Sequence, residues 1–318
     1  MTGRRDLLRR VARVVFVLGV LAALGLTFAV QGHQIGRRFG RLGAMPALGA
    51  FVAVLGALAA SGLAWRAILA DLGSPLRIVP AARIVFVGQL GKYLPGSVWP
   101  MLAQMELGRD AGVPRVRAAT GYVVSTVLTV VTGGAVGILA VPALLGGRGS
   151  GRYALALLVV PAGVALLHPA VVNRLLRLAL RLTRRGELER GLSAGGLLRA
   201  AGWTLVAAGC YGLQAFALAA SIGGGDGARL LPLAVGGYAL ASVAGLLFVI
   251  APAGAGVREA VLVAVLSTAM PVAAATAVAL VSRLLVTAGD TVAAGSAALS
   301  ARAVLRRAAA RAPEAPLG

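Results

Sequence analysis

Long runs of residues without a charged side chain constrain this sequence more than any other feature. A helix needs about 20 predominantly apolar residues to cross the hydrocarbon core of a bilayer, roughly 30 Å thick, and an unpaired charge within it is costly. Because 59% of the 318 residues are hydrophobic and only 13% are charged, an ordinary soluble surface cannot be built. We therefore expect an all-α, polytopic integral membrane protein. Five charge-free runs are long enough and cleanly separated: 14–36, 42–65, 118–147, 153–173 and 200–225.

The C-terminal third is harder to divide. The runs 230–257 and 260–282 are separated only by the pair Arg258-Glu259, and the run 284–301 contains Asp290. We expect a last crossing at 272–299. The stretch 230–270 either crosses the membrane fully or only dips into it, so six to eight crossings remain open.

The stretch 81–108 predicts a re-entrant hairpin. Lys92, Pro95, Gly96 and Pro100 interrupt it and leave apolar arms of about a dozen residues, each near 18–20 Å as helix. Neither arm spans the hydrocarbon core alone. Non-helical backbone at this depth has to be buried in protein or face water.

Basic residues orient the chain. The net charge is +21, from 31 Lys+Arg against 10 Asp+Glu, which favours the anionic cytoplasmic leaflet over nucleic acid as a partner. With the N-terminus inside, most arginines fall in inside loops, seven of them between residues 174 and 199. We therefore expect cytoplasmic termini, an outside loop at 37–41 and, beyond the transmembrane domain 1–300, a basic, proline-containing cytoplasmic tail at 301–318. The arginines of 174–190 indicate either an amphipathic helix on the inner membrane surface or a solvated loop.

The sequence lacks the usual signatures of catalysis. It contains one cysteine, Cys210, and two histidines, His33 and His168, too few for a metal centre built from these residues. It has no phosphate-binding Gly-x-x-x-x-Gly-Lys-Ser/Thr loop and no Gly-x-Ser-x-Gly motif. We expect no cofactor and no metal, and a transporter rather than an enzyme. A membrane-embedded enzyme or accessory subunit acting on a lipid-linked substrate in cell-envelope synthesis is the alternative.

An offset of 157 residues indicates an internal repeat. It places Pro95 on Pro252 and Pro114 on Pro271. Each half, about 42–147 and 200–299, then consists of a span, a Pro/Gly-broken hairpin and a span. An odd number of crossings separates the halves, so they would be inverted relative to each other, as in many transporters.

Polar residues gather at the two broken hairpins and on the last span. Arg283 and Asp290 are seven residues apart, on one face of a helix. They could line a polar path, have a packing role in which each charge is satisfied by a neighbouring helix, or pair with each other. Lys92 either snorkels to the interface or meets an anionic ligand. Trp65, Trp99, Tyr93 and Tyr153 near segment ends are typical of interfacial aromatics. The predicted lipid head-group path comprises Lys92, Tyr93, Pro95, Gly96, Pro252, Gly254, Gly256, Arg258, Glu259, Arg283 and Asp290.

The hairpin sequences resemble a known family. The first reads Gly-Lys-Tyr-Leu-Pro-Gly at 91–96 and the second reads Pro-Ala-Gly-Ala-Gly-Val-Arg-Glu at 252–259. The chain thereby resembles the transmembrane domain of lysylphosphatidylglycerol synthases and the stand-alone, flippase-like membrane proteins related to it, over roughly residues 10–300. The basic residue often found just after Pro-Gly in that family is replaced here by Ser97-Val98-Trp99.

This resemblance implies lipid translocation or the handling of a lipid-linked carrier. We expect no aminoacyl transfer, because no soluble transferase domain follows residue 300. The expected function is movement of an anionic phospholipid or lipid-linked carrier across the cytoplasmic membrane, with anionic lipids and envelope-synthesis enzymes as partners. With one hairpin opening to each side, Lys92 would meet the head group near the inner leaflet and Arg258 near the outer, where Glu259 could neutralise it.

Overall fold

The computed structural model describes residues 43–94, 98–144, 168–182, 191–223, 227–248 and 252–309. Helices and the turns between them account for this part of the chain, and it contains no strand. The predicted first crossing at 14–36, the outside loop 37–41, most of the predicted crossing at 153–173, and the turn residues Pro95 and Gly96 lie outside the described residues.

Five of the helices are long and apolar enough to cross a membrane. Their arrangement confirms an all-α, polytopic membrane protein. Helix α5 ends earlier than the predicted span 118–147, at a short turn before α6 (Ala140–Leu144). Helix α12 continues past residue 301, where we predicted the tail to begin. The five are α2 (Ala44–Asp71), α5 (Arg115–Gly137), α9 (Ala194–Gly223), α10 (Gly227–Leu247) and α12 (Val272–Ala309).

The first hairpin has two helical arms that touch closely. Its first arm runs through α3 (Ile78–Ala82), the π-helical turn η1 (Arg83–Val87) and the 3-10 turn η2 (Leu90–Tyr93). Its second arm is α4 (Trp99–Arg109). A Cβ atom on Gly91 would lie 2.8 Å from the backbone nitrogen of Pro100. Only glycine therefore lets the arms approach this closely near the tip.

The second hairpin consists of α10, the 3-10 turn η3 (Pro252–Gly254) and α11 (Val257–Leu266). Helix α11 has ten residues, about 15 Å of helix, which is too short to cross the hydrocarbon core. It packs back against α10. The region 230–270 therefore forms a hairpin with one arm long enough to cross the hydrocarbon core and one arm too short, and whether the long arm crosses or only dips stays open.

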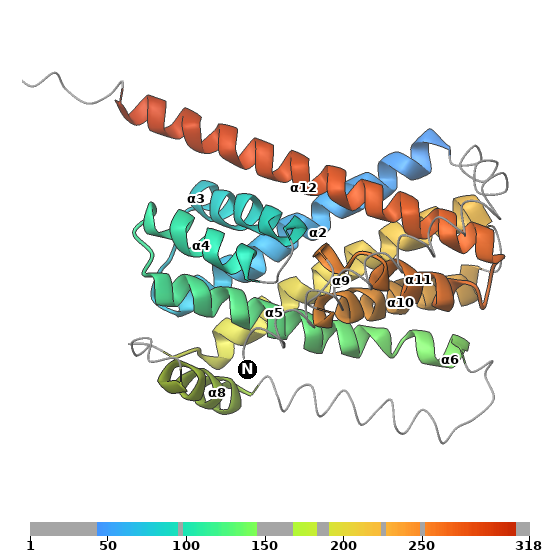
Figure 1. Cartoon of the computed structure of the whole chain (residues 1–318), viewed down its shortest axis with the longest axis horizontal. Helices are drawn as coiled ribbons and strands as arrows, with labels where there is room; N and C mark the ends of the chain where they lie inside the picture. Colours follow the sequence, from blue (N-terminus) through green and yellow to red (C-terminus); the bar gives the residue numbers. More distant parts are fainter. Residues whose placement is uncertain are drawn as a thin grey trace, which may run out of the picture.

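The two hairpins lie at opposite ends of the molecule. Figure 1 shows α3 and α4 at the end where α2 stops and α5 begins, and α10 and α11 at the end where α9 stops and α12 begins. Helix α2 packs along α9, and the chain runs in opposite directions in the two sets of elements. The division into two inverted repeats stays our proposal, and this arrangement supports it.

A short helix covers the end that holds the first hairpin. Helix α8 (Pro169–Leu182) buries Val172 and Leu176, while Arg174 and Arg177 are exposed. Residues 174–182 of the predicted stretch are thus part of an amphipathic helix, and 183–190 lie outside the described residues. Its position on the inner membrane surface remains a prediction.

Candidate functional site

The tips of the two hairpins meet inside the helical body. The η2 turn of the first hairpin contacts the η3 turn of the second. Beside this contact lies a cavity of about 290 Å³. Its wall also includes residues of α2, α5, α9, α10 and α12, so all five long helices contribute to it.

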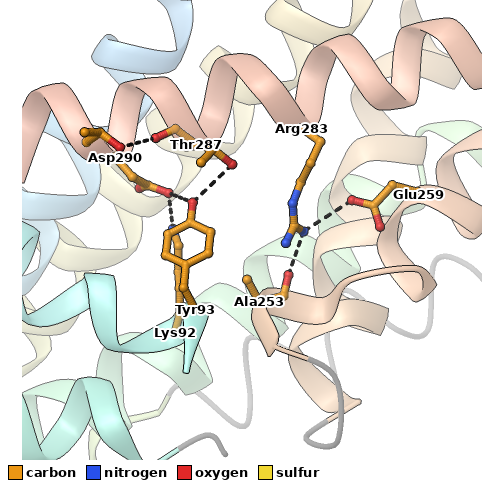
Figure 2. Close-up of polar contacts among 8 residues, drawn as sticks. Lys92, Tyr93, Ala253, Glu259, Arg283, Thr287 and Asp290 are labelled. Atoms are coloured by element: carbon orange, nitrogen blue, oxygen red, sulfur yellow. Dashed lines mark hydrogen bonds and ion pairs between the residues drawn. The ribbon is translucent and has the colours of Figure 1, made fainter. Parts of the chain in front are cut away.

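The first tip is held to α12 by an ion pair. Lys92 Nζ lies 2.6 Å from Oδ2 of Asp290, which is only 3% exposed. The hydroxyl of Tyr93 donates a hydrogen bond of 2.6 Å to the same carboxylate oxygen. Figure 2 shows both side chains of the tip pointing at α12. The first hairpin thereby pairs Asp290 with a cation and a hydroxyl donor, both at Oδ2.

The second tip is held to the same helix by Arg283. Its guanidinium Nη1 donates to the carbonyl oxygen of Ala253 at 3.0 Å and lies 3.2 Å from Oε1 of Glu259 (Figure 2). Ala253 has a φ of 50°, a left-handed conformation that costs a non-glycine residue free energy. The other oxygen of Glu259 accepts a hydrogen bond from the backbone N–H of Gly256 at 2.6 Å. Arg283 therefore holds the strained turn through the carbonyl of Ala253 and through the carboxylate of Glu259.

Arg258 stands apart from these pairs. Its guanidinium lies 4.6 Å from the ring centroid of Tyr238, a cation–π distance, and that ring stacks on Tyr211 at 5.3 Å. Within the described part of the chain no carboxylate forms an ion pair with Arg258. An aromatic face orients this cation without neutralising it.

The cavity is positively charged. Lys92, Arg258 and Arg283 belong to its wall, and no Asp or Glu of the described residues does. Asp290 and Glu259 do not line the cavity. They form ion pairs with Lys92 and Arg283, respectively. Low-dielectric surroundings strengthen such a field, so the cavity attracts anions.

The wall also carries neutral polar groups, several of them without a partner. The indole Nε1 of Trp65, Oε1 of Gln89, Oε1 of Gln104 and the hydroxyl of Tyr238 are buried and make no hydrogen bond within the described structure. Buried polar atoms without partners are rare and call for an explanation. A ligand in the cavity would explain these atoms, because it could form the missing hydrogen bonds.

A family model described as Lysylphosphatidylglycerol synthase TM region matches residues 11–294. The chain belongs to this family. The match confirms the resemblance carried by the hairpin sequences and places the chain among membrane proteins of lipid and cell-envelope metabolism. A comparison with curated proteins gives no match.

Most of the described residues of the predicted lipid head-group path lie close together in the structure. Lys92, Tyr93, Gly254, Arg258 and Arg283 line the cavity. Pro252 and Gly256 belong to the second tip, and Glu259 and Asp290 lie behind the wall. Pro95 and Gly96, predicted for the first tip, lie outside the described residues.

The structure decides between pairings that the sequence leaves open. Asp290 pairs with Lys92 and not with Arg283 on its own helix, because the first hairpin inserts its tip beside α12. Glu259 pairs with Arg283, so the expectation that it neutralises Arg258 is wrong. Lys92 and Arg258 line one cavity, and the leaflet that each of them serves stays a prediction.

Sequence reasoning also misjudged or missed neutral residues. Trp65 is 2% exposed and lines the cavity, so it is not an interfacial aromatic, whereas Trp99 is 45% exposed. Tyr93 is committed to Asp290. The missed residue with a visible signal is Gln104, because a side-chain amide inside an apolar stretch is costly to bury without a purpose.

The described residues contain no group of three His, Cys, Asp or Glu side chains that could hold a metal. The chemistry that this wall does support is electrostatic and hydrogen-bonding recognition of an anion.

Proposed function

We propose that this protein moves an anionic phospholipid or an anionic lipid-linked carrier across the cytoplasmic membrane. The observation that carries the proposal is the cavity at the meeting point of the two hairpin tips, with Lys92, Arg258 and Arg283 on its wall. An anionic head group passing through roughly 30 Å of hydrocarbon needs compensating positive charge at depth.

The state of the three cations supports this function. Lys92 and Arg283 form ion pairs with the carboxylates of Asp290 and Glu259, which hold the tips in place. Arg258 rests on the ring of Tyr238 and can bind a phosphate without leaving a described carboxylate unpaired. Among the described residues of the wall, a head group therefore finds one basic side chain whose charge is not already neutralised.

The placement of the hairpins supports access from both sides. One hairpin lies at each end of the molecule (Figure 1), and the cavity lies beside the contact between their tips. Small displacements of either hairpin would open the cavity toward one end. This is the arrangement that alternating access in inverted-repeat transporters uses.

The test is lipid movement by purified protein reconstituted in liposomes. The panel contains fluorescent phosphatidylglycerol, phosphatidylcholine, phosphatidylethanolamine and polyprenyl phosphate, and a membrane-impermeant quencher reports the lipid that reaches the outer leaflet. We expect faster exchange of at least one anionic lipid than in protein-free liposomes. Exchange at the protein-free rate for every lipid would contradict the proposal and favour an accessory role.

A further inference from the structure

Asp290 is buried in the helical body, and its cation comes from a hairpin tip. Its side chain is 3% exposed, and it lies on α12, a helix long and apolar enough to cross a membrane. In the described part of the chain it forms an ion pair with Lys92 of the first tip, at 2.6 Å. Ionisable residues at such depth are costly and often belong to ion or proton paths. Asp290 is therefore a candidate titrating site as well as an anchor for the tip.

Lys92 stands between this carboxylate and the cavity. Its side chain lines the cavity and is 24% exposed, whereas Asp290 does not line it. An anion in the cavity and the carboxylate of Asp290 therefore compete for one ammonium group. A buried carboxylate that loses its cation takes up a proton, because an isolated charge is very costly in low-dielectric surroundings. Binding of an anion in the cavity thus favours protonation of Asp290.

The surroundings of Asp290 can accommodate the added proton. In the ion-paired state the hydroxyl of Tyr93 donates to Oδ2 of Asp290 at 2.6 Å. The same hydroxyl lies 3.4 Å from Oγ1 of Thr287 (Figure 2). A protonated carboxyl group has an O–H donor, which can donate to the tyrosine oxygen while the tyrosine hydroxyl donates to Thr287. Both protonation states of Asp290 therefore have hydrogen-bond partners in place.

The other titratable groups that face Asp290 come from helices packed on α12. Tyr211 of α9 and Arg258 of α11 interact with it electrostatically. Arg283, two turns earlier on α12, is paired with Glu259 of α11. Charged residues on the other elements packed on α12 are engaged elsewhere: Arg66 and Asp71 of α2 bond Leu76 and Ser193, and Arg83 of η1 pairs with Asp110.

The ion pair of the second tip is less suited to such an exchange. Arg283 bonds the carbonyl of Ala253 in addition to Glu259, so an anion that drew it away would also release the strained turn. Glu259 additionally accepts a hydrogen bond from the backbone N–H of Gly256 at 2.6 Å. The first tip is therefore the place where an anion and a proton can exchange partners.

We propose that Asp290 is a proton-binding site that couples lipid movement to protons. This rests on the proposed function and adds its coupling ion. One proton passes from water to the carboxylate of Asp290 as Lys92 turns to the phosphate of the head group. The proton returns to water when the phosphate leaves and the ion pair forms again. A lipid with one negative charge and one proton move together, so no net charge crosses the membrane and the lipid moves toward the less acidic side.

The first test uses the full-length protein in liposomes with a gradient of about one pH unit. The membrane potential is clamped with valinomycin and equal potassium, and an impermeant quencher reports the leaflet distribution of fluorescent phosphatidylglycerol and polyprenyl phosphate. We expect at least one of them to accumulate in the leaflet facing the less acidic side, up to roughly tenfold at one proton per lipid. A sodium gradient at equal pH should cause no accumulation.

Equal distribution of every anionic lipid that the protein moves would overturn the inference and leave the proposed function intact. Accumulation driven by the sodium gradient would overturn it in the same way.

Substitutions locate the proton. Asp290→Asn removes the titrating group and should abolish the accumulation. Lys92→Gln with Asp290→Asn leaves no unpaired charge at the site, and it should abolish the accumulation as well, which guards against poor folding of the single variant. Asp110→Asn is the matched control, since its carboxylate is 50% exposed and pairs with Arg83 away from the cavity. It should keep the accumulation. Accumulation that survives in either Asp290 variant would overturn the inference.

Infrared difference spectroscopy tests the proton site without transport. Ether-linked phosphatidylglycerol and polyprenyl phosphate have no ester carbonyl, and each is added to the purified protein in detergent at constant pH. At least one should raise the carbonyl band of a protonated carboxyl group, and Asp290→Asn but not Asp110→Asn should remove that rise. No rise with either lipid would overturn the inference. A rise without movement of any lipid in liposomes would support the inference and contradict the proposed function.

Discussion

Lys92 Nζ lies 2.6 Å from Oδ2 of Asp290, and this pair joins the first hairpin tip to the helix that also holds the second. Arg283 of the same helix, seven residues earlier, binds Ala253 and Glu259 of the second tip. Seven residues of α-helix span about 10 Å. Helix α12 thereby holds both tips in place beside the cavity.

The Lys92–Asp290 pair should be a stability element. Lys92→Gln leaves a carboxylate that is 3% exposed without its cation, which typically costs about 3–5 kcal/mol. We expect a lower thermal unfolding midpoint in detergent, measured by tryptophan fluorescence, and partial recovery in Lys92→Gln with Asp290→Asn. A double variant no more stable than Lys92→Gln alone would show that the pair is not coupled.

Arg283 should be coupled to Glu259 and not to Asp290. Arg283→Gln removes the cation from Glu259 and one donor from the Ala253 carbonyl, so the unfolding midpoint should fall. The second substitution Glu259→Gln should restore part of the loss, and Asp290→Asn should restore none. Arg109→Gln, on a side chain that is 64% exposed, is the control and should change the midpoint little. Rescue by Asp290→Asn would show that the pairing described above is wrong.

The second tip should depend on Gly254. This residue has a φ of 66°, and a Cβ atom there would lie 2.7 Å from Cα of Gly245. Gly254→Ala adds a clash with α10 to the backbone strain, so lipid exchange in liposomes should fall more than the inserted amount does. Gly112→Ala isolates the strain, because Gly112 has a φ of 74° with nothing within 4 Å of the added atom. It should cost about 1 kcal/mol of stability and little exchange. Equal effects of the two variants on exchange would contradict the close approach of η3 to α10.

Cysteine labelling tests the orientation of the chain. In a Cys210→Ala background, Arg177→Cys on α8 and Arg229→Cys at the start of α10 place thiols on exposed side chains at opposite ends of the molecule. The positive-inside rule predicts that the first is labelled from the cytoplasm and the second from outside. Impermeant maleimide on intact cells and on inverted vesicles measures this. Labelling of both from the same face would contradict the inverted arrangement of the hairpins.

Charge-free runs and prolines were sufficient to predict much of the fold. Crossing helices depend on local apolar length, so 42–65, 200–225 and 272–299 were placed to within a few turns. The Pro/Gly interruptions at 92–100 predicted a hairpin because they break helix locally. Boundaries were less accurate where a helix extends past the hydrocarbon, as α12 does.

The partners of the buried charges could not be predicted in the same way. Arg283 and Asp290 share a helix face, yet each pairs with a hairpin tip distant in sequence. These contacts depend on how deeply the hairpins insert, which local periodicity does not contain. The stacked Tyr211 and Tyr238 beneath Arg258 likewise come from two helices whose relative rotation the sequence pattern leaves open.

Arg258 provides the most direct test of head-group recognition. The measurement is exchange of anionic lipid in liposomes by Arg258→Gln, normalised to inserted protein, beside wild type and the exposed control Arg229→Gln. Because no described carboxylate depends on Arg258, the amount of folded protein should stay near that of wild type while exchange falls about tenfold or more, with Arg258→Lys between them. Unchanged exchange in Arg258→Gln at wild-type levels of inserted protein would contradict the account.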